Sequence, residues 1–239
     1  RCSLAVLMVA AGALGAGCNF TTVQGSGNVV TEERTIPDRA SVSICCGFHL
    51  RLEVGSTRSF EITGDDNVLE RVQVVDRGDD IVVEPTNASL SFQPSEPVIV
   101  DVTLTDLAGV ALSGGGQAQV GAFTADDVEA TLSGGSRATF NGVETDLWRP
   151  TISGGGVVTV ESGSTARQRI DASGGSEYRA RRLGSSHATV RASGGSRVTI
   201  AVSQSLEATA SGGSRVEYDG RPAVDAQRTG GSTVERIEP

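Results

Sequence analysis

Arginine and threonine side chains recur at matching positions of a repeated segment, and they are the first candidates for chemistry. Three arginines share one place in the repeat and three threonines share another: Arg137, Arg197 and Arg215, and Thr139, Thr159 and Thr199. Guanidinium groups bind carboxylates and other anions with directed hydrogen bonds. Threonine rows are also typical of exposed β-strands. We interpret this surface as a solvated strand face, and the alternative is a binding face for an anionic glycan.

Residues for catalysis or metal binding do not gather in the sequence. His49 alternates with Leu50 and Leu52 and is expected to face solvent, while His187 follows two serines in an expected loop. No Gly-x-Ser-x-Gly elbow occurs, and no paired carboxylates recur on the Arg and Thr face. The runs 65–67 and 126–127 offer carboxylate and amide oxygens, but we interpret them as solvated turns. We therefore expect no catalytic residues, no metal and no cofactor.

Two cysteines are neighbours in the chain, Cys45 and Cys46. The simpler interpretation is a pair of small residues with free thiols at the end of a strand. A disulfide between adjacent residues is the alternative, because an exported protein lies in an oxidising compartment. Adjacent pairing is strained and easily reduced.

The first residues are typical of an export signal. Arg1 precedes a short apolar run, and small residues precede Cys18, which is similar to the lipobox of bacterial lipoproteins except that Gly15 stands where leucine is usual. We predict a signal peptide over residues 1–17, lipidation of Cys18, a flexible tether over residues 18–27, and a membrane anchor that does not span the bilayer. Asn19 after Cys18 is compatible with the outer membrane, on its periplasmic or surface side.

Composition limits the core and the partners. The chain has 239 residues, a net charge of −9 and no lysine among its 20 basic residues, so nucleic acid is not an expected partner. Glycine accounts for 31 residues, while aromatic residues make up only 4%. Small and β-branched side chains must therefore fill the core.

A repeated tripeptide, Ser-Gly-Gly, predicts the strands that position the arginine and threonine side chains. We call each copy of it a corner, because the chain is expected to turn there. Successive corners from Ser113 to Thr229 are 20, 20, 20, 20, 18 and 18 residues apart. This period predicts stacked coils of a solenoid, with two strands in each coil. Corners stacked at the strand spacing need φ > 0, which glycine adopts without strain. The corner glycines are Gly114, Gly115, Gly134, Gly135, Gly154, Gly155, Gly174, Gly175, Gly194, Gly195, Gly212 and Gly213.

The part before the repeats is also β-rich but less regular. Alternation of polar and apolar residues predicts strands over residues 41–44, 48–54, 59–63, 71–75, 80–84 and 98–104, with a helical turn over 68–70 and a loop over 85–97. No linker precedes the first corner. We expect one all-β domain over residues 28–239, a parallel β-helix with irregular coils over 28–111 and regular repeats over 112–237. Arg228 and Arg236 replace inward apolar residues and predict a polar end to the stack.

Four segments carry a family resemblance: residues 25–30 (GSGNVV), 50–55 (LRLEVG), 64–69 (GDDNVL) and 112–115 (LSGG). Their order and the repeat resemble the head GIN domain, the DUF2807 family of putative auto-transporter adhesins. The resemblance implies an exported, often lipid-anchored parallel β-helix and offers no catalytic residues. We expect a non-catalytic envelope lipoprotein acting as an adhesin-like protein or an assembly scaffold; the alternative is a polysaccharide-binding or polysaccharide-degrading protein. The partner and the oligomeric state stay open.

Overall fold

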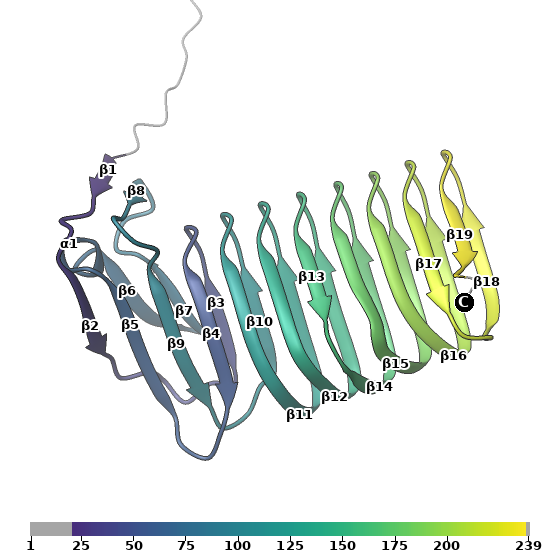
Figure 1. Ribbon diagram of the computed structural model, residues 1–239, viewed down its shortest axis with the longest axis horizontal. Coiled ribbons are helices and arrows are strands. Elements are labelled where there is room, and N and C mark those ends of the chain that lie inside the picture. The colour runs from purple at the N-terminus through teal and green to yellow at the C-terminus, as the bar shows by residue number, and fades with distance from the viewer. Residues whose placement is uncertain (1–20, 238–239) are drawn as a thin grey trace, which may run out of the picture.

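The computed structural model describes residues 21–237, which form a long stack of β-coils (Figure 1). The predicted signal peptide and Cys18 lie outside the described residues. The expected fold class, an all-β parallel solenoid with a less regular N-terminal part, is confirmed. Regular coils occupy the C-terminal part, and mixed strands close the N-terminal end.

The regular coils are built from parallel strands whose partners lie one repeat apart. Ala118 pairs with Ala138, and Ala138 pairs with Val158. The strands are β10 (Gly109–Leu112), β11 (Gln117–Leu132), β12 (Arg137–Ile152), β13 (Val157–Val160), β14 (Gly163–Ala172), β15 (Glu177–Ala192), β16 (Arg197–Ala210), β17 (Arg215–Asp219), β18 (Ala223–Arg228) and β19 (Thr233–Arg236). The change from 20-residue to 18-residue coils is absorbed between β15 and β16, where the register shifts after Ala180 and after Ser185.

The 20-residue coil that contains β11 has three straight segments, where we expected two. In β11 the buried residues are Ala118 and Val120, then Phe123, then Val128, Ala130 and Leu132. Alternation along a strand puts every second side chain inside. Within a straight strand, inward residues lie an even number of positions apart. Val120 and Phe123 are three positions apart, and Phe123 and Val128 are five apart, so the chain turns between the members of each pair, in addition to the glycine corner.

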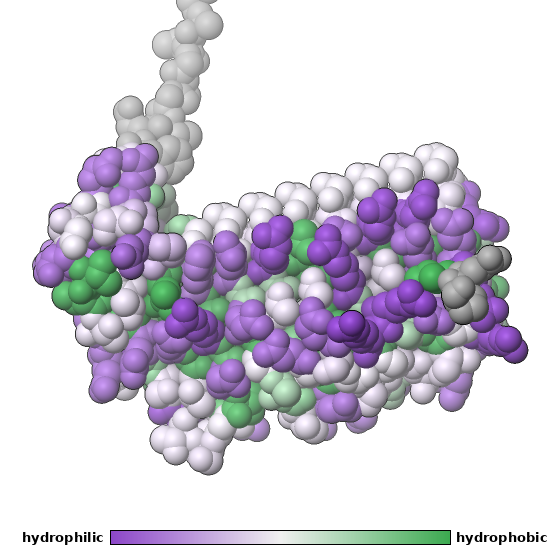
Figure 2. All heavy atoms as spheres, viewed as in Figure 1, coloured by the Kyte–Doolittle hydropathy of each residue, from purple (hydrophilic) through white to green (hydrophobic). Residues whose placement is uncertain are grey.

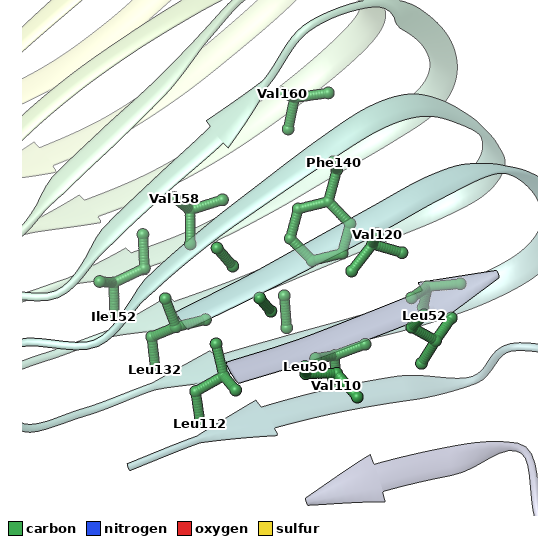
Figure 3. Close-up of a cluster of buried hydrophobic side chains, with 14 of the residues drawn as sticks. Leu50, Leu52, Val110, Leu112, Val120, Leu132, Phe140, Ile152, Val158 and Val160 are labelled. Carbon is green, nitrogen blue, oxygen red and sulfur yellow. The ribbon is translucent and has the colours of Figure 1, made fainter. Parts of the chain in front are cut away.

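Inward side chains of successive coils stack into apolar rows (Figure 3). One row contains Leu52, Val120, Phe140 and Val160, which are paired from strand to strand. All four are almost fully buried. The core is not limited to the expected small and β-branched residues, because it also contains many leucines and several rings. Among the rings, Trp148 contacts Phe140 edge-on with ring centroids 4.8 Å apart.

The Ser-Gly-Gly corners are type I′ turns, which we call tips. In the tip at Ser133, the Ser136 amide donates to the Ser133 carbonyl at 3.3 Å, and φ is +64° at Gly134 and +80° at Gly135. Positive φ at both central positions defines this turn type. All twelve predicted corner glycines have positive φ. The tips form a pale ridge of small residues along one edge of the molecule (Figure 2).

A serine after the two glycines supports most of the regular tips from inside. Ser176 and Ser196 are buried, and their hydroxyls donate to the carbonyls of Ile152 and Ala172 in the preceding coil. These hydrogen bonds satisfy carbonyl groups at the end of the apolar strand. The serine therefore belongs to the architecture of the tip.

The N-terminal region combines parallel and antiparallel strands. Its elements are β1 (Thr21–Gln24), β2 (Val29–Glu33), β3 (Ser41–Ile44), β4 (His49–Val54), β5 (Ser59–Asp65), α1 (Asp66–Leu69), β6 (Val72–Arg77), β7 (Asp80–Pro85), β8 (Leu90–Gln93) and β9 (Ile99–Leu104). β3 pairs with β10 and β4 pairs with β11, so this region continues directly into the coils. β5 runs antiparallel to β2 and β9, and β2 is the outermost strand at this end of the stack (Figure 1).

Two expectations for the N-terminal region are wrong. The segment 21–27, expected in a flexible tether, contains β1, which pairs in parallel with β8. β8 itself lies inside the segment 85–97 that we expected to be a loop. Each short strand supplies the other's backbone partners, and neither has a periodic pattern long enough to identify it alone.

A group of side-chain hydrogen bonds, which we call the N-terminal clasp, holds residues 25–28 against residues 65–67. Asp65 is fully buried and accepts hydrogen bonds from the Ser95 hydroxyl and amide and from the Gly27 amide, at 2.6, 2.8 and 2.7 Å. Asp66 accepts from Ser26 and Asn28. The interpretation of residues 65–67 as a solvated turn is therefore wrong, because these oxygens bind donors 30 to 40 residues away in sequence.

Candidate binding face

The predicted Arg and Thr positions lie on one flat surface, which we call the strand face. It is the outward side of the first strand segment after each tip, contributed by β4, β11, β12, β13, β15, β16, β17 and β19. Its first row is His49, Gln117, Arg137, Val157, Glu177, Arg197, Arg215 and Thr233. Its second row is Arg51, Gln119, Thr139, Thr159, Arg179, Thr199, Glu217 and Glu235.

The structure brings only some of the predicted residues together. Arg197 and Arg215 are direct neighbours, but Val157 and Glu177 separate Arg137 from Arg197. The expected stacked row of arginine is therefore interrupted, because two coils place other side chains at that position.

The threonine row is interrupted in the same way. Thr139 pairs with Thr159, and Arg179 separates Thr159 from Thr199. The predicted threonines are all partly exposed on the strand face. They therefore lie on one surface without forming a continuous ladder.

Two of the three arginines in the C-terminal half of the strand face have a carboxylate partner on the same face, and the third, Arg197, forms no ion pair within residues 21–237. Arg179 donates a 2.6 Å hydrogen bond to Glu177, and this contact lowers the pKa of the Glu177 carboxyl and raises the pKa of Arg179. Arg215 lies 3.8 Å from Glu217 and 3.5 Å from Glu235. Guanidinium groups with a carboxylate partner on the same face are less available to an anionic ligand.

The N-terminal half of the strand face has a shallow depression of about 150 Å³, which we call the donor patch. Its polar lining is His49, Arg51, Gln117, Gln119, Arg137 and Thr139. Arg51 lies 3.7 Å from Asp101, and Gln119 donates to Asn141 at 2.8 Å. Arg137 is exposed and forms no ion pair within residues 21–237. A free guanidinium thus lies among amide and imidazole groups.

The residues that join Arg137 and Thr139 in the donor patch were missed from the sequence as binding candidates. His49 and Arg51 come from β4, far from β12 in sequence, and they reach the patch because β4 pairs with β11. The alternation of His49 and Arg51 with Leu50 and Leu52 is the signal that could have found them. It places both side chains outward, in line with the first regular coil.

A larger open depression, of about 620 Å³, lies on another side of the solenoid. Ser41, Gly109 and Ala111 line it together with Asp38, Asp79, Asp80, Glu129, Arg39 and Arg149. Arg39 binds Asp76 at 2.8 Å and Arg149 lies 3.0 Å from Asp127, so both arginines already have carboxylate partners. Asp126 and Asp127 are exposed and lie within β11 between the buried side chains of Phe123 and Val128, where the coil turns.

The described residues show no arrangement for acid–base catalysis. The carboxyls with displaced pKa values are Asp65, Asp66 and Glu177, and hydrogen bonds lower the pKa of each. A general acid at neutral pH needs a raised pKa. Within residues 21–237 no three His, Cys, Asp or Glu side chains are grouped to hold a metal ion.

The second histidine has an unexpected position. His187 lies within β15, where we expected a loop, and its Nδ1 is 2.8 Å from the Ser205 hydroxyl. The strand continues through His187, although its register with β16 shifts between Ser185 and His187. His187 therefore belongs to a side of the coil other than the strand face.

The last coil carries its two arginines outside. Arg228 pairs with Ala210 and Arg236 with Tyr218, and both arginines are exposed. The rows of inward side chains that contain Ala210 and Tyr218 therefore end at Arg228 and Arg236 in the last coil. The sequence predicts such a charged end to the stack.

Comparison with known proteins identifies the fold. None of the helices in the described part of the chain is both long and apolar enough to cross a membrane. No match was found among curated protein sequences. A putative adhesin from Bacteroides fragilis has a similar structure, with a TM-score of 0.84 and 17% identity, covering 90% of this chain and 100% of that one.

Two further solved structures have the same architecture. A putative lipid binding protein from Parabacteroides distasonis superposes with a TM-score of 0.73 at 16% identity, covering 91% of this chain and 100% of that one. A putative adhesin from Parabacteroides merdae has a TM-score of 0.70 at 21% identity, covering 91% and 99%. A sequence model of one family matches residues 40–222, which is most of the chain. With its coils, its glycine tips and this match, the chain belongs to the family described as putative auto-transporter adhesin, head GIN domain (DUF2807).

Proposed function

We propose that the chain is a non-catalytic, lipid-anchored head of the bacterial cell envelope that binds an anionic polysaccharide through its strand face. The observation that carries this proposal is the donor patch, where Arg137 has no ion pair within the described residues and lies beside His49, Gln117 and Gln119. Hydroxyl and carboxylate groups of a glycan accept hydrogen bonds from such donors. The membership of an adhesin-like family supports a binding role.

The shape of the face supports an extended ligand. Neighbouring coils repeat at the strand spacing of about 4.8 Å, so equivalent side chains are offered at regular intervals along the stack. A chain of sugar units presents its polar groups at regular intervals too. A glycan that lies along several coils would make a weak contact with each coil, and together these contacts would give a measurable affinity.

The anchor is the second part of the proposal. Only two residues separate Cys18 from Thr21 at the start of β1, and the three Cα–Cα steps between them span no more than about 10 Å. If Cys18 carries lipid, the N-terminal end of the solenoid lies close to the bilayer and the coils extend away from it. Metabolic labelling with palmitate tests this: we expect label on the native chain and none on Cys18→Ala, and label on both would contradict it.

The binding part is tested with the whole protein on an array of bacterial polysaccharides, together with an assay for released reducing sugar. We expect retention of anionic polysaccharide that weakens about tenfold or more in Arg137→Ala, because a hydrogen bond to a charged group contributes roughly 1.5–3 kcal/mol. Arg191→Ala is the matched control, since Arg191 is exposed but pairs with Asp171 away from the strand face.

Three outcomes would contradict the proposal. Equal loss in Arg137→Ala and Arg191→Ala would show that binding follows overall charge. Release of reducing sugar would show an enzyme, and retention of proteins alone would show an assembly scaffold.

A further inference from the structure

The structure assigns the Cys45–Cys46 pair as a thiol–disulfide exchange site at the first tip of the solenoid. The two residues form a disulfide, so the expectation of free thiols is wrong. The site would take two electrons from an external dithiol and return them to an external disulfide. This inference does not depend on the proposed glycan ligand.

The disulfide lies in a tip with the same backbone as the Ser-Gly-Gly tips. The Phe48 amide donates to the Cys45 carbonyl at 3.2 Å, and φ is +68° at Cys46 and +78° at Gly47. Cys46 is the one non-glycine residue with positive φ in the described chain. Cys45, Cys46 and Gly47 thus occupy the places of Ser, Gly and Gly.

The position of this tip explains how it tolerates a side chain. A Cβ at Gly134 would lie 3.1 Å from the amide nitrogen of Gly114, and one at Gly114 would lie 3.0 Å from that of Cys46. The first central residue of each tip therefore points toward the preceding tip. On that side of Cys46, β7 is joined to β9 through β8, not through a two-residue corner. A side chain fits at Cys46 because no tip precedes it in the described chain.

The tip is exposed above a fixed base. Cys46 and Gly47 are exposed and Cys45 is half-buried, whereas Phe48 is almost fully buried and its ring lies 5.9 Å from that of Phe92. Rates of thiol–disulfide exchange depend on access to the sulfur that is attacked. Because Cys46 is the more exposed residue of the pair, we expect an external thiolate to attack its sulfur first.

The disulfide is poorly suited to a role as a cross-link. Disulfides stabilise proteins mainly by closing loops in the unfolded chain, and this one joins residues with a sequence separation of 1. It fastens no two strands together. It can therefore open and close without releasing any element of the fold, which is what a redox cycle requires.

The reaction balances with a dithiol as the second reactant. A thiolate of the dithiol attacks the Cys46 sulfur, forming a mixed disulfide and releasing the Cys45 thiolate, which takes a proton. The second thiol of the reductant then attacks the mixed disulfide, giving the oxidised reductant and the Cys46 thiol. Two electrons and two protons pass to the protein.

Reduction also changes what the backbone requires. The ring formed by the disulfide holds Cys46 in the left-handed region, which non-glycine residues rarely adopt. Once the ring opens, Cys46 is free to leave this conformation. We expect faster amide exchange at residues 45–48 in the reduced protein, with β3 and β4 unchanged.

The test uses the whole oxidised protein, dithiothreitol as the dithiol, and mass spectrometry after alkylation. We expect dithiothreitol to expose both thiols while the strands stay folded, and glutathione disulfide to close them again. Thiols that appear only after unfolding in guanidinium, or a pair that glutathione disulfide does not close, would overturn the assignment.

Two variants separate chemistry from architecture. Cys45→Ser with Cys46→Gly restores Ser-Gly-Gly, and we expect it to fold with a melting midpoint at least as high as that of the reduced native protein, yet to take no label at these positions. A failure of this variant to fold would overturn the tip assignment. Cys45→Ser alone should form a mixed disulfide with glutathione several-fold faster than Cys46→Ser, and the reverse order would overturn the proposed point of attack.

Discussion

The regular coils and the N-terminal region achieve stability in different ways. In the coils, backbone ladders and apolar rows repeat, and the tips use glycine so that one coil can lie directly on the next. In the N-terminal region, the side-chain hydrogen bonds of the clasp and antiparallel strands close the stack. The backbone N–H and C=O groups of an inner coil form hydrogen bonds with the coils on both sides. The first coil has no coil on one side, so it needs specific side chains to close the stack.

The two kinds of tip show the same contrast on a smaller scale. At Gly194, a Cβ would lie 2.9 Å from the amide nitrogen of Gly174 in the preceding tip. At Cys46 there is a side chain and a disulfide, with the same sign of φ. Stacking therefore determines where glycine is needed, in addition to the backbone conformation.

The largest expected effect breaks the stacking of the tips. Gly194→Ala must place a Cβ against backbone at φ +66°, whereas Gly195→Ala has φ +82° and no atom within 4 Å of the new Cβ. The left-handed conformation costs roughly 1–2 kcal/mol for an L-residue, and a backbone clash adds about 1–3 kcal/mol. We expect equilibrium unfolding to show a loss of about 2–5 kcal/mol for Gly194→Ala and about 1–2 kcal/mol for Gly195→Ala. Equal losses would contradict the role of stacking.

The second effect tests a buried polar network inside the coils. Trp148 donates to the Tyr178 hydroxyl at 2.9 Å, and this hydroxyl donates to Gln168 at 2.8 Å. Burial raises the pKa of Tyr178 far above its ordinary value, so the hydroxyl stays protonated. Tyr178→Phe leaves both partners without this contact and should cost about 1–3 kcal/mol.

Tyr218→Phe is the control for this network, because Tyr218 is only partly buried near the end of the stack. Guanidinium unfolding followed by Trp148 fluorescence measures both variants. If Tyr178→Phe is no less stable than Tyr218→Phe, the network contributes no stability.

The smallest expected effect separates the two regions by pH. Hydrogen bonds from Ser95 and Gly27 lower the pKa of Asp65 from 3.8, and those from Ser26, Asn28 and Asn67 lower the pKa of Asp66. A carboxyl with a lowered folded-state pKa stabilises the fold above its unfolded pKa, and this stability is lost as the pH falls through the folded value. We expect amide exchange in β1 and β2 to accelerate below about pH 4 while β12 stays protected.

Asp65→Asn is the variant for this prediction. It keeps the size of the side chain but puts an amide where three donors converge, so β1 and β2 should already exchange faster at neutral pH. Thermal unfolding should show a smaller change than for Gly194→Ala. Acid sensitivity that is equal in β2 and β12, or unchanged in Asp65→Asn, would contradict the assignment to the clasp.

Much of the fold can be predicted from the sequence. Strands over 41–44 and 80–84 agree with β3 and β7 to within a residue or two, and the helical turn near residue 68 is α1. The alternation of polar and apolar residues and the 20-residue period are both properties of the local sequence. The folded chain retains both, as alternately buried side chains and as coils of the same length. The number of straight segments per coil was harder to predict, because small residues such as Gly121 and Ala122 weaken the alternation where the chain turns.

The candidate site could be predicted only in part. Placing Arg137 and Thr139 on an outward surface needs only the strand period. His49 and Arg51 of the donor patch come from β4, and the pairing of β4 with β11 joins residues more than 60 positions apart in the chain. The clasp was missed for the same reason, since Asp65 forms hydrogen bonds with Ser95 and Gly27, which lie 30 and 38 residues away in the sequence. No short sequence pattern indicates contacts over such distances.

By itself the sequence determined the coil length, the places of the tips and which side chains face inward, because these depend on spacing along the chain. Only the tertiary structure decided which outward side chains become neighbours. It also decided that Asp65 is buried and that Cys46 can replace a glycine. Those outcomes depend on the residues that lie above and below a given residue in the stack. The local sequence of one strand does not determine which residues of the next coil lie beside it.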